Sequence, residues 1–327
     1  DIYLIAWSYV AKDDFNDFLQ PYVNSGHKFF VAPGVSLSER VWPKHYEFVS
    51  NITNLCRDGY KNGALGVINT CWDDFGESLT NSALYGLALG AEISWNPLKD
   101  NASHFSNRQI EENFSTHFFG CASLEPLHSL HDLSQMTQFD EIGKFSALTE
   151  PITPFYPAWI DADFEQRNVD AVVEMALLSK KLEAGKKAVK KNASIFGNAQ
   201  YALHRMQWCA ERNLVRCQLY RTYNDPTEDN IAESRQMIRE LMANLHPLKN
   251  EYVKVWNIES RPYWLDVNMK KYDDLAKELQ NIEYLPIIES ATDNQGRAAI
   301  ILRTIFADKE IHYTVDGKEV TATDSIY

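Results

Sequence analysis

Trp72, Asp73 and Asp74 follow one another in the stretch GALGVINTCWDDFGES, where a short apolar run leads into a polar loop. An indole face can stack on the axial C–H bonds of a sugar ring, and a carboxylate can accept hydrogen bonds from the sugar hydroxyls. This combination at the end of a strand favours a carbohydrate-binding site. The competing interpretation is structural, with a packed tryptophan and with Asp73 or Asp74 capping the helix that begins after Gly76.

Two further apolar runs end in side chains of similar kinds. Trp7 and Tyr9 end the first run, and Arg40 and Trp42 lie in the loop that follows the second. We expect Trp7, Tyr9 and Arg40 to bind substrate together with Trp72. The structural alternatives are a core tryptophan, a loop tyrosine and a surface ion pair of Arg40.

A catalytic pair of carboxyl groups is not evident. Glycoside cleavage needs an acid with a raised pKa and a second carboxyl group. Asp73 and Asp74 are adjacent, and adjacent loop residues need not face the same bond. Asp140 and Glu141 lie in an irregular segment, and we interpret them as unrelated to the chemistry. We therefore assign no catalytic residue in this chain.

No metal or cofactor is predicted. His128 and His131 have the i, i+3 spacing of one helix face, but no carboxylate partner is evident for a metal site. The five cysteines form no CxxC pair and are expected to be free thiols. The chain has no GxGxxG, P-loop, HExxH or GxSxG motif.

The elements that must position these side chains are β/α units over residues 1–95. Short apolar runs alternate with helical stretches, which is typical of a parallel sheet covered on both faces. Polar, aromatic-rich loops at the strand ends suit the carboxyl face of a TIM barrel. We expect the last three β/α units of a (β/α)8 catalytic barrel, completed by a missing N-terminal part. A small open α/β sheet is the alternative. The runs are residues 2–7, 28–32 and 65–70.

Three further segments follow. Residues 96–160 are expected to form an irregular, partly helical connection. Residues 161–284 have apolar positions at three- and four-residue spacing, which predicts an α-helical bundle. Residues 285–327 are strand-like and predict the start of a β-sandwich, with a hairpin turn at Asp316-Gly317. The fold class is therefore α/β, followed by helices and a short β segment.

Composition excludes several partners. The formal net charge of −13 argues against binding to nucleic acid or to an anionic membrane surface, because both need clustered Lys and Arg. No apolar run reaches the roughly 18 residues expected of a membrane span. The opening residues, DIYLIAW, have the pattern of a buried strand, so we expect further sequence upstream.

Several motifs together resemble family 20 glycoside hydrolases, the β-N-acetylhexosaminidases. They are VAPGVSLSERVWP, NGALGVINTCWDDFGE and YGLALGAEISWNP, which are similar to the last three units of that barrel. The resemblance implies that Trp72 and Trp7 wall the sugar pocket and that Asp74 binds the far hydroxyls. ESRPYWLD and IHYTVDGKEVTATDSIY are similar to the helical and C-terminal β domains of such enzymes.

The chain also departs from that pattern. The family's Asp-Glu catalytic pair follows the fourth strand, which lies outside this chain, and SLSERVWP stands where the family has Tyr-x-Asp. The resemblance thus implies a parent protein that removes terminal β-linked N-acetylhexosamine by substrate-assisted retaining hydrolysis. In that protein, this chain would supply binding walls and no acid.

We therefore expect a secreted or periplasmic glycosidase with an N-acetylhexosamine-containing glycan as its partner. A non-catalytic glycan-binding or scaffold protein that keeps part of the pocket is the alternative. An unrelated α/β and helical-bundle interaction protein is a third hypothesis.

Overall fold

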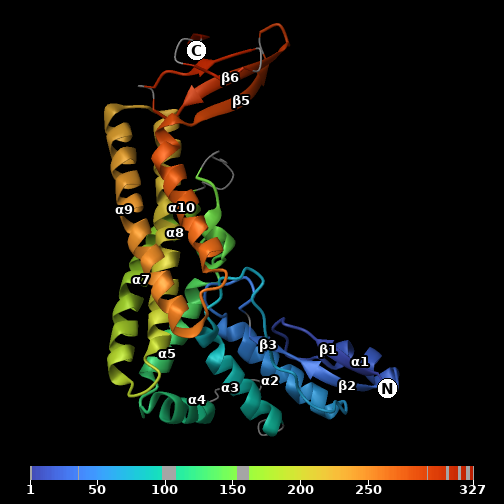
Figure 1. Cartoon of the computed structure of the whole chain (residues 1–327). Coiled ribbons are helices and arrows are strands. Elements are labelled where there is room, and N and C mark those ends of the chain that lie inside the picture. Colours follow the sequence, from blue (N-terminus) through green and yellow to red (C-terminus); the bar gives the residue numbers. More distant parts are fainter. Residues whose placement is uncertain are drawn as a thin grey trace.

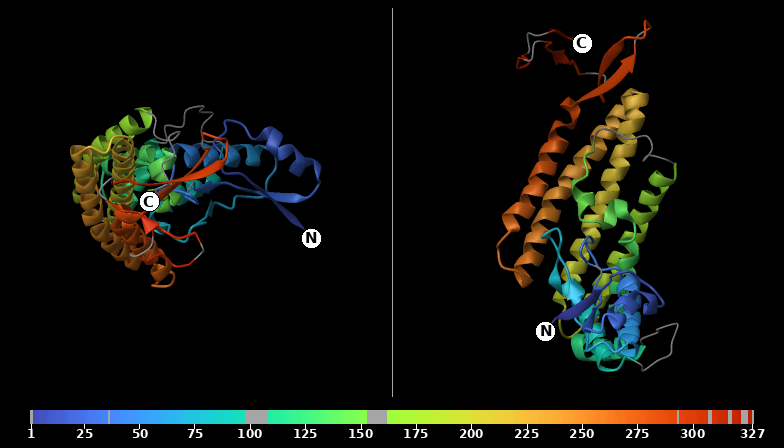
Figure 2. Two further views of the ribbon diagram at one scale, coloured as in Figure 1. Left: turned by 90° about the horizontal axis from the view of Figure 1, so that it is seen from above. Right: turned by 90° about the vertical axis from the view of Figure 1, so that its right-hand side faces the viewer.

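The computed structural model describes residues 2–35, 37–97, 108–152, 162–292, 294–306, 309–315, 318–321 and 325–326. A small strand-and-helix unit at the N-terminal end lies beside the foot of a tall helical bundle (Figure 1). A β hairpin stands at the opposite end of the bundle, far from the N-terminal strands in Figure 1 and in the right-hand view of Figure 2. The fold is thus rich in α-helix with a small amount of sheet.

Parallel strands form the N-terminal unit. Each residue of β1 pairs in parallel register with β2, from Tyr3 with Lys28 to Trp7 with Ala32. β3 pairs in parallel with β4, and a bridge between Val31 and Val67 links the two pairs. The carboxyl ends of three neighbouring chain segments therefore lie at one edge. The strands are β1 (Tyr3–Trp7), β2 (Lys28–Ala32), β3 (Gly34–Val35) and β4 (Thr70–Cys71).

Helices cover one face of these strands. Leu19 of α1 (Asn16–Asn24) and Leu55 of α2 (His45–Lys61) pack on Ala6, Phe29 and Val31 of the strands. On the other face of β1, alternate side chains are exposed, since every second residue of a strand points the same way. These exposed residues are Tyr3, Ile5 and Trp7.

The expected TIM barrel is not found. Each sheet formed by the described residues has two strands, in the orders β1-β2, β3-β4, β5-β6 and β7-β8. The apolar runs correctly predicted parallel strands, but a barrel closes only when strands pair on both sides of each neighbour. Among the described residues, β1 pairs with β2 alone.

Short helices connect this unit to the bundle. Phe114, Phe119 and Leu127 are buried in the large core that continues into the bundle, so the connection packs closely although it is irregular in sequence. It contains α3 (Leu84–Trp95), α4 (Arg108–Phe114), a π-helical turn (Ser115–Phe119), α5 (Glu125–Met136) and α6 (Asp140–Gly143), with 3-10 turns at Thr80–Ala83 and Ser146–Thr149.

Four long helices make up the bundle. The central one, α8, buries side chains on all its faces, including Arg205 and Arg212, because α7 and α9 flank it and the connection packs against it. The helices are α7 (Ala162–Ala188), α8 (Ser194–Asn224), α9 (Glu228–Glu259) and α10 (Leu265–Asn281), followed by a 3-10 turn at Ile282–Tyr284. No helix in the described ranges combines the length and apolar character needed to cross a membrane.

The C-terminal β segment begins with an antiparallel hairpin of β5 (Pro286–Thr292) and β6 (Ala298–Thr304). Exposed and partly covered residues alternate along β5, as expected for a strand covered on one face only. β7 (His312–Tyr313) pairs with β8 (Ser325–Ile326). The turn predicted at Asp316-Gly317 lies outside the described residues.

Candidate functional site

Three aromatic side chains meet at the carboxyl edge of the parallel strands. The Trp72 indole N–H donates a hydrogen bond of 2.7 Å to the hydroxyl oxygen of Tyr9. The rings of Trp7 and Tyr9 have their centroids 5.5 Å apart and are tilted by 35°. Trp7 is 62% exposed and Trp72 is 51% exposed. We call Trp7, Tyr9 and Trp72 the aromatic platform.

Asn51 of α2 holds the chain that carries Tyr9. Its side-chain amide donates to the carbonyls of Ser8, at 2.8 Å, and Val10, at 3.0 Å. Its Oδ1 accepts from the backbone N–H of Gly34 at 3.1 Å. A Cβ atom on Gly34 would lie 2.8 Å from Cδ1 of Tyr9, so the tyrosine ring rests on bare backbone. The position of Tyr9 is therefore set by a fully buried asparagine and a glycine.

Trp72 is anchored through the strand before it. The backbone N–H and the hydroxyl of Thr70 both donate to the carbonyl of Pro33, each at 2.9 Å. Asn69 donates to the carbonyl of Gly86 at 3.1 Å, which ties the same stretch to α3. Trp72 thus leaves a short strand that is fixed on two sides.

The two aspartates after Trp72 differ in their surroundings. Asp73 Oδ1 accepts hydrogen bonds from the backbone N–H of Glu77, at 3.2 Å, and from the hydroxyl of Ser78, at 3.0 Å. Asp73 therefore organises the turn that it begins. Asp74 is exposed in the same loop, where a carboxylate can accept hydrogen bonds from a ligand.

Arg40 binds partners outside the platform. Its guanidinium donates to the carbonyl of Thr137, at 2.8 Å, and to Asp140, at 2.5 Å. Arg40 is 9% exposed, so this ion pair is largely buried on the arginine side. Trp42 is also turned inward, with its N–H donating to the carbonyl of Leu130 at 3.0 Å. The loop after β3 thus fastens the strand unit to the connection.

Glu77 joins the loop that follows Trp72 to the bundle, a role that the sequence analysis did not predict. Its carboxylate pairs with Arg205 of α8 at 2.6 Å and with Lys271 of α10 at 2.5 Å. Burial acts to raise the pKa of Glu77, but the two cations outweigh it and lower this pKa below its usual value. The backbone carbonyl of Glu77 accepts from the hydroxyl of Tyr252 at 3.1 Å. An arginine among apolar residues, as in YALHRMQWCA, was the available signal for a buried ion pair.

The histidines pack in the connection. His128 contacts Glu111 at 3.2 Å, and the rings of His131 and His45 have their centroids 3.6 Å apart. Burial lowers the pKa of His45 to about 4, with a smaller contribution from the charge of His128. Within the described ranges, no group of three or more His, Cys, Asp or Glu side chains is arranged to hold a metal ion.

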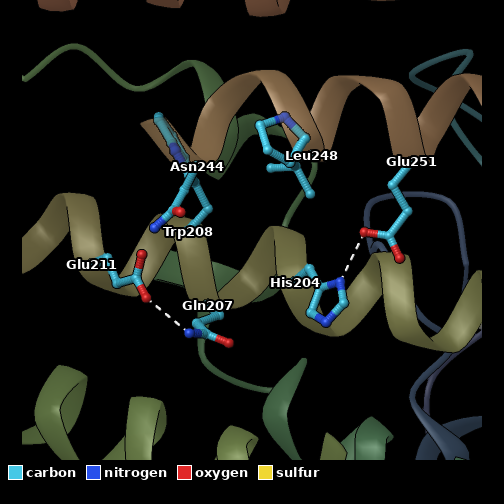
Figure 3. A pocket seen from close by; sticks show the side chains of 8 residues that line it. His204, Gln207, Trp208, Glu211, Asn244, Leu248 and Glu251 are labelled. Carbon is cyan, nitrogen blue, oxygen red and sulfur yellow. Dashed lines mark hydrogen bonds and ion pairs between the residues drawn. The ribbon is translucent and has the colours of Figure 1, made fainter. Parts of the chain in front are cut away.

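A hollow of about 300 Å³ lies between α8 and α9, and none of the three platform residues lines it (Figure 3). His204 pairs with Glu251 at 2.8 Å, and Gln207 donates to Glu211 at 2.8 Å. The contact with Glu251 raises the pKa of His204. Four polar side chains of the hollow thus bind one another in two pairs. Its tryptophan, Trp208, is buried and donates to the carbonyl of Leu241.

Comparisons with known proteins correct the family expected from the motifs. No family model matches the chain, and no curated protein matches it. A solved GH138 enzyme targeting pectin rhamnogalacturonan II is similar in structure, with a TM-score of 0.44 and 9% sequence identity. The similarity covers 76% of this chain and 37% of that chain, so this chain spans little more than a third of its length.

The expected membership of family 20 is therefore wrong. No family model matches the chain, so none supports the motifs on which that expectation was based. A Trp-x-acid sequence after a strand is only three residues long, and here its middle residue, Asp73, is engaged in the turn that follows Trp72. The role of an N-acetyl sugar pocket, taken from that family, is withdrawn with it.

Proposed function

We propose that this chain contributes the sugar-binding surface of a glycoside hydrolase, with the aromatic platform and Asp74 holding one pyranose ring. The observation that carries the proposal is the hydrogen bond from Trp72 to Tyr9, which joins two strand ends into one surface with exposed indoles. Exposed apolar clusters with polar rims mark binding sites, and indoles provide flat faces for sugar C–H groups. In this proposal Asp74 accepts hydrogen bonds from hydroxyls.

Arg40 and Asp73 have positioning roles in this proposal. Asp73 shapes the loop that carries Trp72, and Arg40 fastens the strand unit through Asp140. The net charge of −13 favours a neutral glycan over an acidic one, because like charges repel at long range. Many polymeric glycans lie outside the cytoplasm, so a secreted or periplasmic location belongs to the same proposal.

The uncovered face of β1 supports a further part of the proposal. Tyr3 and Ile5 are both about half exposed on a strand that pairs on one side only among the described residues. Exposed apolar strands of this kind are normally covered or paired. We infer that additional parallel strands complete the sheet here and carry the acid and the second carboxyl group that hydrolysis requires.

A glycan-binding protein without turnover is the second candidate. The observation that favours it is the engagement of Asp73 in the turn, which leaves Asp74 as the member of the aspartate pair that is not bound within this turn. Release of nitrophenol from nitrophenyl glycosides separates the two candidates, because binding alone gives no release.

The test of sugar binding is a titration of this chain with methyl glycosides of glucose, galactose, N-acetylglucosamine and galacturonic acid, followed by calorimetry. We expect Trp72→Ala to lower the affinity for the ligand that binds best at least tenfold, or about 1.4 kcal/mol. Trp95→Ala is the matched control, since Trp95 is 91% exposed at the last residue of α3 and is not part of the aromatic platform. Equal affinity of the two variants would refute the platform.

A further inference from the structure

Trp264 has an unusual backbone conformation for a large side chain. It directly precedes α10 and has φ 68° and ψ −7°. The other described non-glycine residue with positive φ is Asn192, a type that tolerates this region well. Such conformations in bulky residues persist only where the surroundings impose them, and they are concentrated at binding sites.

The surroundings of Trp264 belong to the loop that carries Trp72. A Cβ atom on Gly76 would lie 2.7 Å from Nε1 and 2.9 Å from Cδ1 of the Trp264 indole. Gly76 itself has φ 67°, which suits glycine. The indole thus lies against bare backbone, four residues after Trp72 along the chain.

A second contact fixes the same arrangement. The side-chain amide of Asn268, one turn into α10, donates to the carbonyl of Gly76 at 2.6 Å and to the hydroxyl of Tyr252 at 3.0 Å. The backbone N–H of Asn268 donates to the carbonyl of Trp264 at 3.2 Å. Asn268 therefore holds both the Trp72 loop and the residue that carries the indole.

The Trp264 side chain nevertheless remains 58% exposed. Nε1 and Cδ1 are the indole atoms nearest Gly76, which leaves the six-membered ring as the part farther from this contact. A rigidly held, half-exposed indole loses little conformational freedom when it binds a flat ligand. In Figures 1 and 2 the turn between α9 and α10 lies beside the loop that follows β4 and carries Trp72.

We propose that Trp264 stacks on a second sugar unit of the glycan whose first unit lies on Trp72. The helical bundle would then supply a binding subsite, and the preferred ligand would be an oligosaccharide. This inference rests on the proposed function, because it needs the first unit to occupy the aromatic platform.

The experiment compares Trp264→Ala, Trp264→Phe and Trp72→Ala in the intact chain, with the methyl glycoside that binds best and the tetrasaccharide of the same sugar as ligands. We expect Trp264→Ala to lower the affinity for the tetrasaccharide about tenfold, or about 1.4 kcal/mol. The affinity for the methyl glycoside should change by less than twofold. Trp264→Phe keeps an aromatic face and should restore most of the tetrasaccharide affinity. Trp72→Ala should weaken both ligands.

Three results would overturn the inference. An unchanged tetrasaccharide affinity in Trp264→Ala would remove the subsite while leaving the platform in place. Equal weakening of both ligands, without rescue by phenylalanine, would mean that Trp264 only supports the loop. Failure of the unmodified chain to bind any saccharide would refute the proposed function itself, and the subsite with it. Circular dichroism and thermal melts of each variant exclude unfolding as the cause.

Discussion

Removal of the charge on Glu77 should destabilise the protein strongly. Glu77→Gln keeps the side-chain volume but leaves Arg205, which is fully buried, without its anionic partner. Loss of one member of a buried pair costs about 3–5 kcal/mol. Arg205 keeps a hydrogen bond of 2.8 Å to the Phe145 carbonyl and one of 3.1 Å to the Tyr201 hydroxyl, and Lys271 can turn toward water. The expected loss is therefore at the lower end, about 3 kcal/mol.

The measurement is urea unfolding at pH 7, with Glu165→Gln as the control. Glu165 forms an ion pair with Arg221 at 2.8 Å, but both side chains are more than a third exposed. Exposed pairs of this kind contribute about 0–1 kcal/mol. The double variant Glu77→Gln/Arg205→Met should recover part of the loss, because no buried charge remains unpaired.

The effect of Glu77→Gln should also depend on pH. The folded-state pKa of Glu77 is lowered, so its contribution to stability is complete above the unfolded-state value and is lost as pH falls through the folded-state value. The difference between Glu77→Gln and the unmodified chain should therefore shrink in acid. A loss no larger than that of Glu165→Gln at pH 7 would refute the reasoning.

Two further predictions concern the histidines and Asn51. The pKa of His45 is lowered from 6.5 to about 4, so the neutral ring contributes stability above pH 6.5 that is lost as pH falls toward 4, up to about 3 kcal/mol. Urea unfolding midpoints measured from pH 7 to 4.5 should decline less steeply in His45→Phe than in the unmodified chain. An equally steep decline would mean that neighbouring groups such as His131, His128 and Glu111 cause the loss of stability. Asn51→Ala removes the hydrogen bonds to Ser8, Val10 and Gly34, and should cost about 2–3 kcal/mol and weaken sugar binding through Tyr9. Unchanged binding in a folded Asn51→Ala variant would show that the Tyr9 loop needs no such support.

Local patterns in the sequence predicted the local elements. The apolar runs at residues 2–7 and 28–32 became β1 and β2, and the helical spacing after residue 161 became the long helices. The run at residues 65–70 formed only a two-residue strand, Thr70–Cys71, with Val67 in a single bridge. Pairing partners decide how much of an apolar run becomes strand, and these partners are not encoded in the run itself.

Contacts between distant residues were not predictable in the same way. The partner of Arg40, Asp140, lies 100 residues further along the chain in the connection. Glu77 and Arg205 are separated by 128 residues, and nothing in either neighbourhood identifies the other. Single-sequence patterns report which side chains will be buried, whereas the choice of partner depends on how whole helices pack.

The same long-range contacts make the bundle part of the candidate site. The loop after Trp72 begins at Asp73, whose carboxylate accepts a hydrogen bond from the backbone of the same loop. Its end, at Gly76 and Glu77, is held by Arg205 of α8 and by Lys271 and Asn268 of α10. A surface that must present flat rings to a ligand benefits from such support, because loops alone hold side chains less accurately than packed elements do. The helices and the strand unit therefore form one structural support for the platform, and a fragment of residues 1–95 would lose the contacts that fix Gly76 and Glu77.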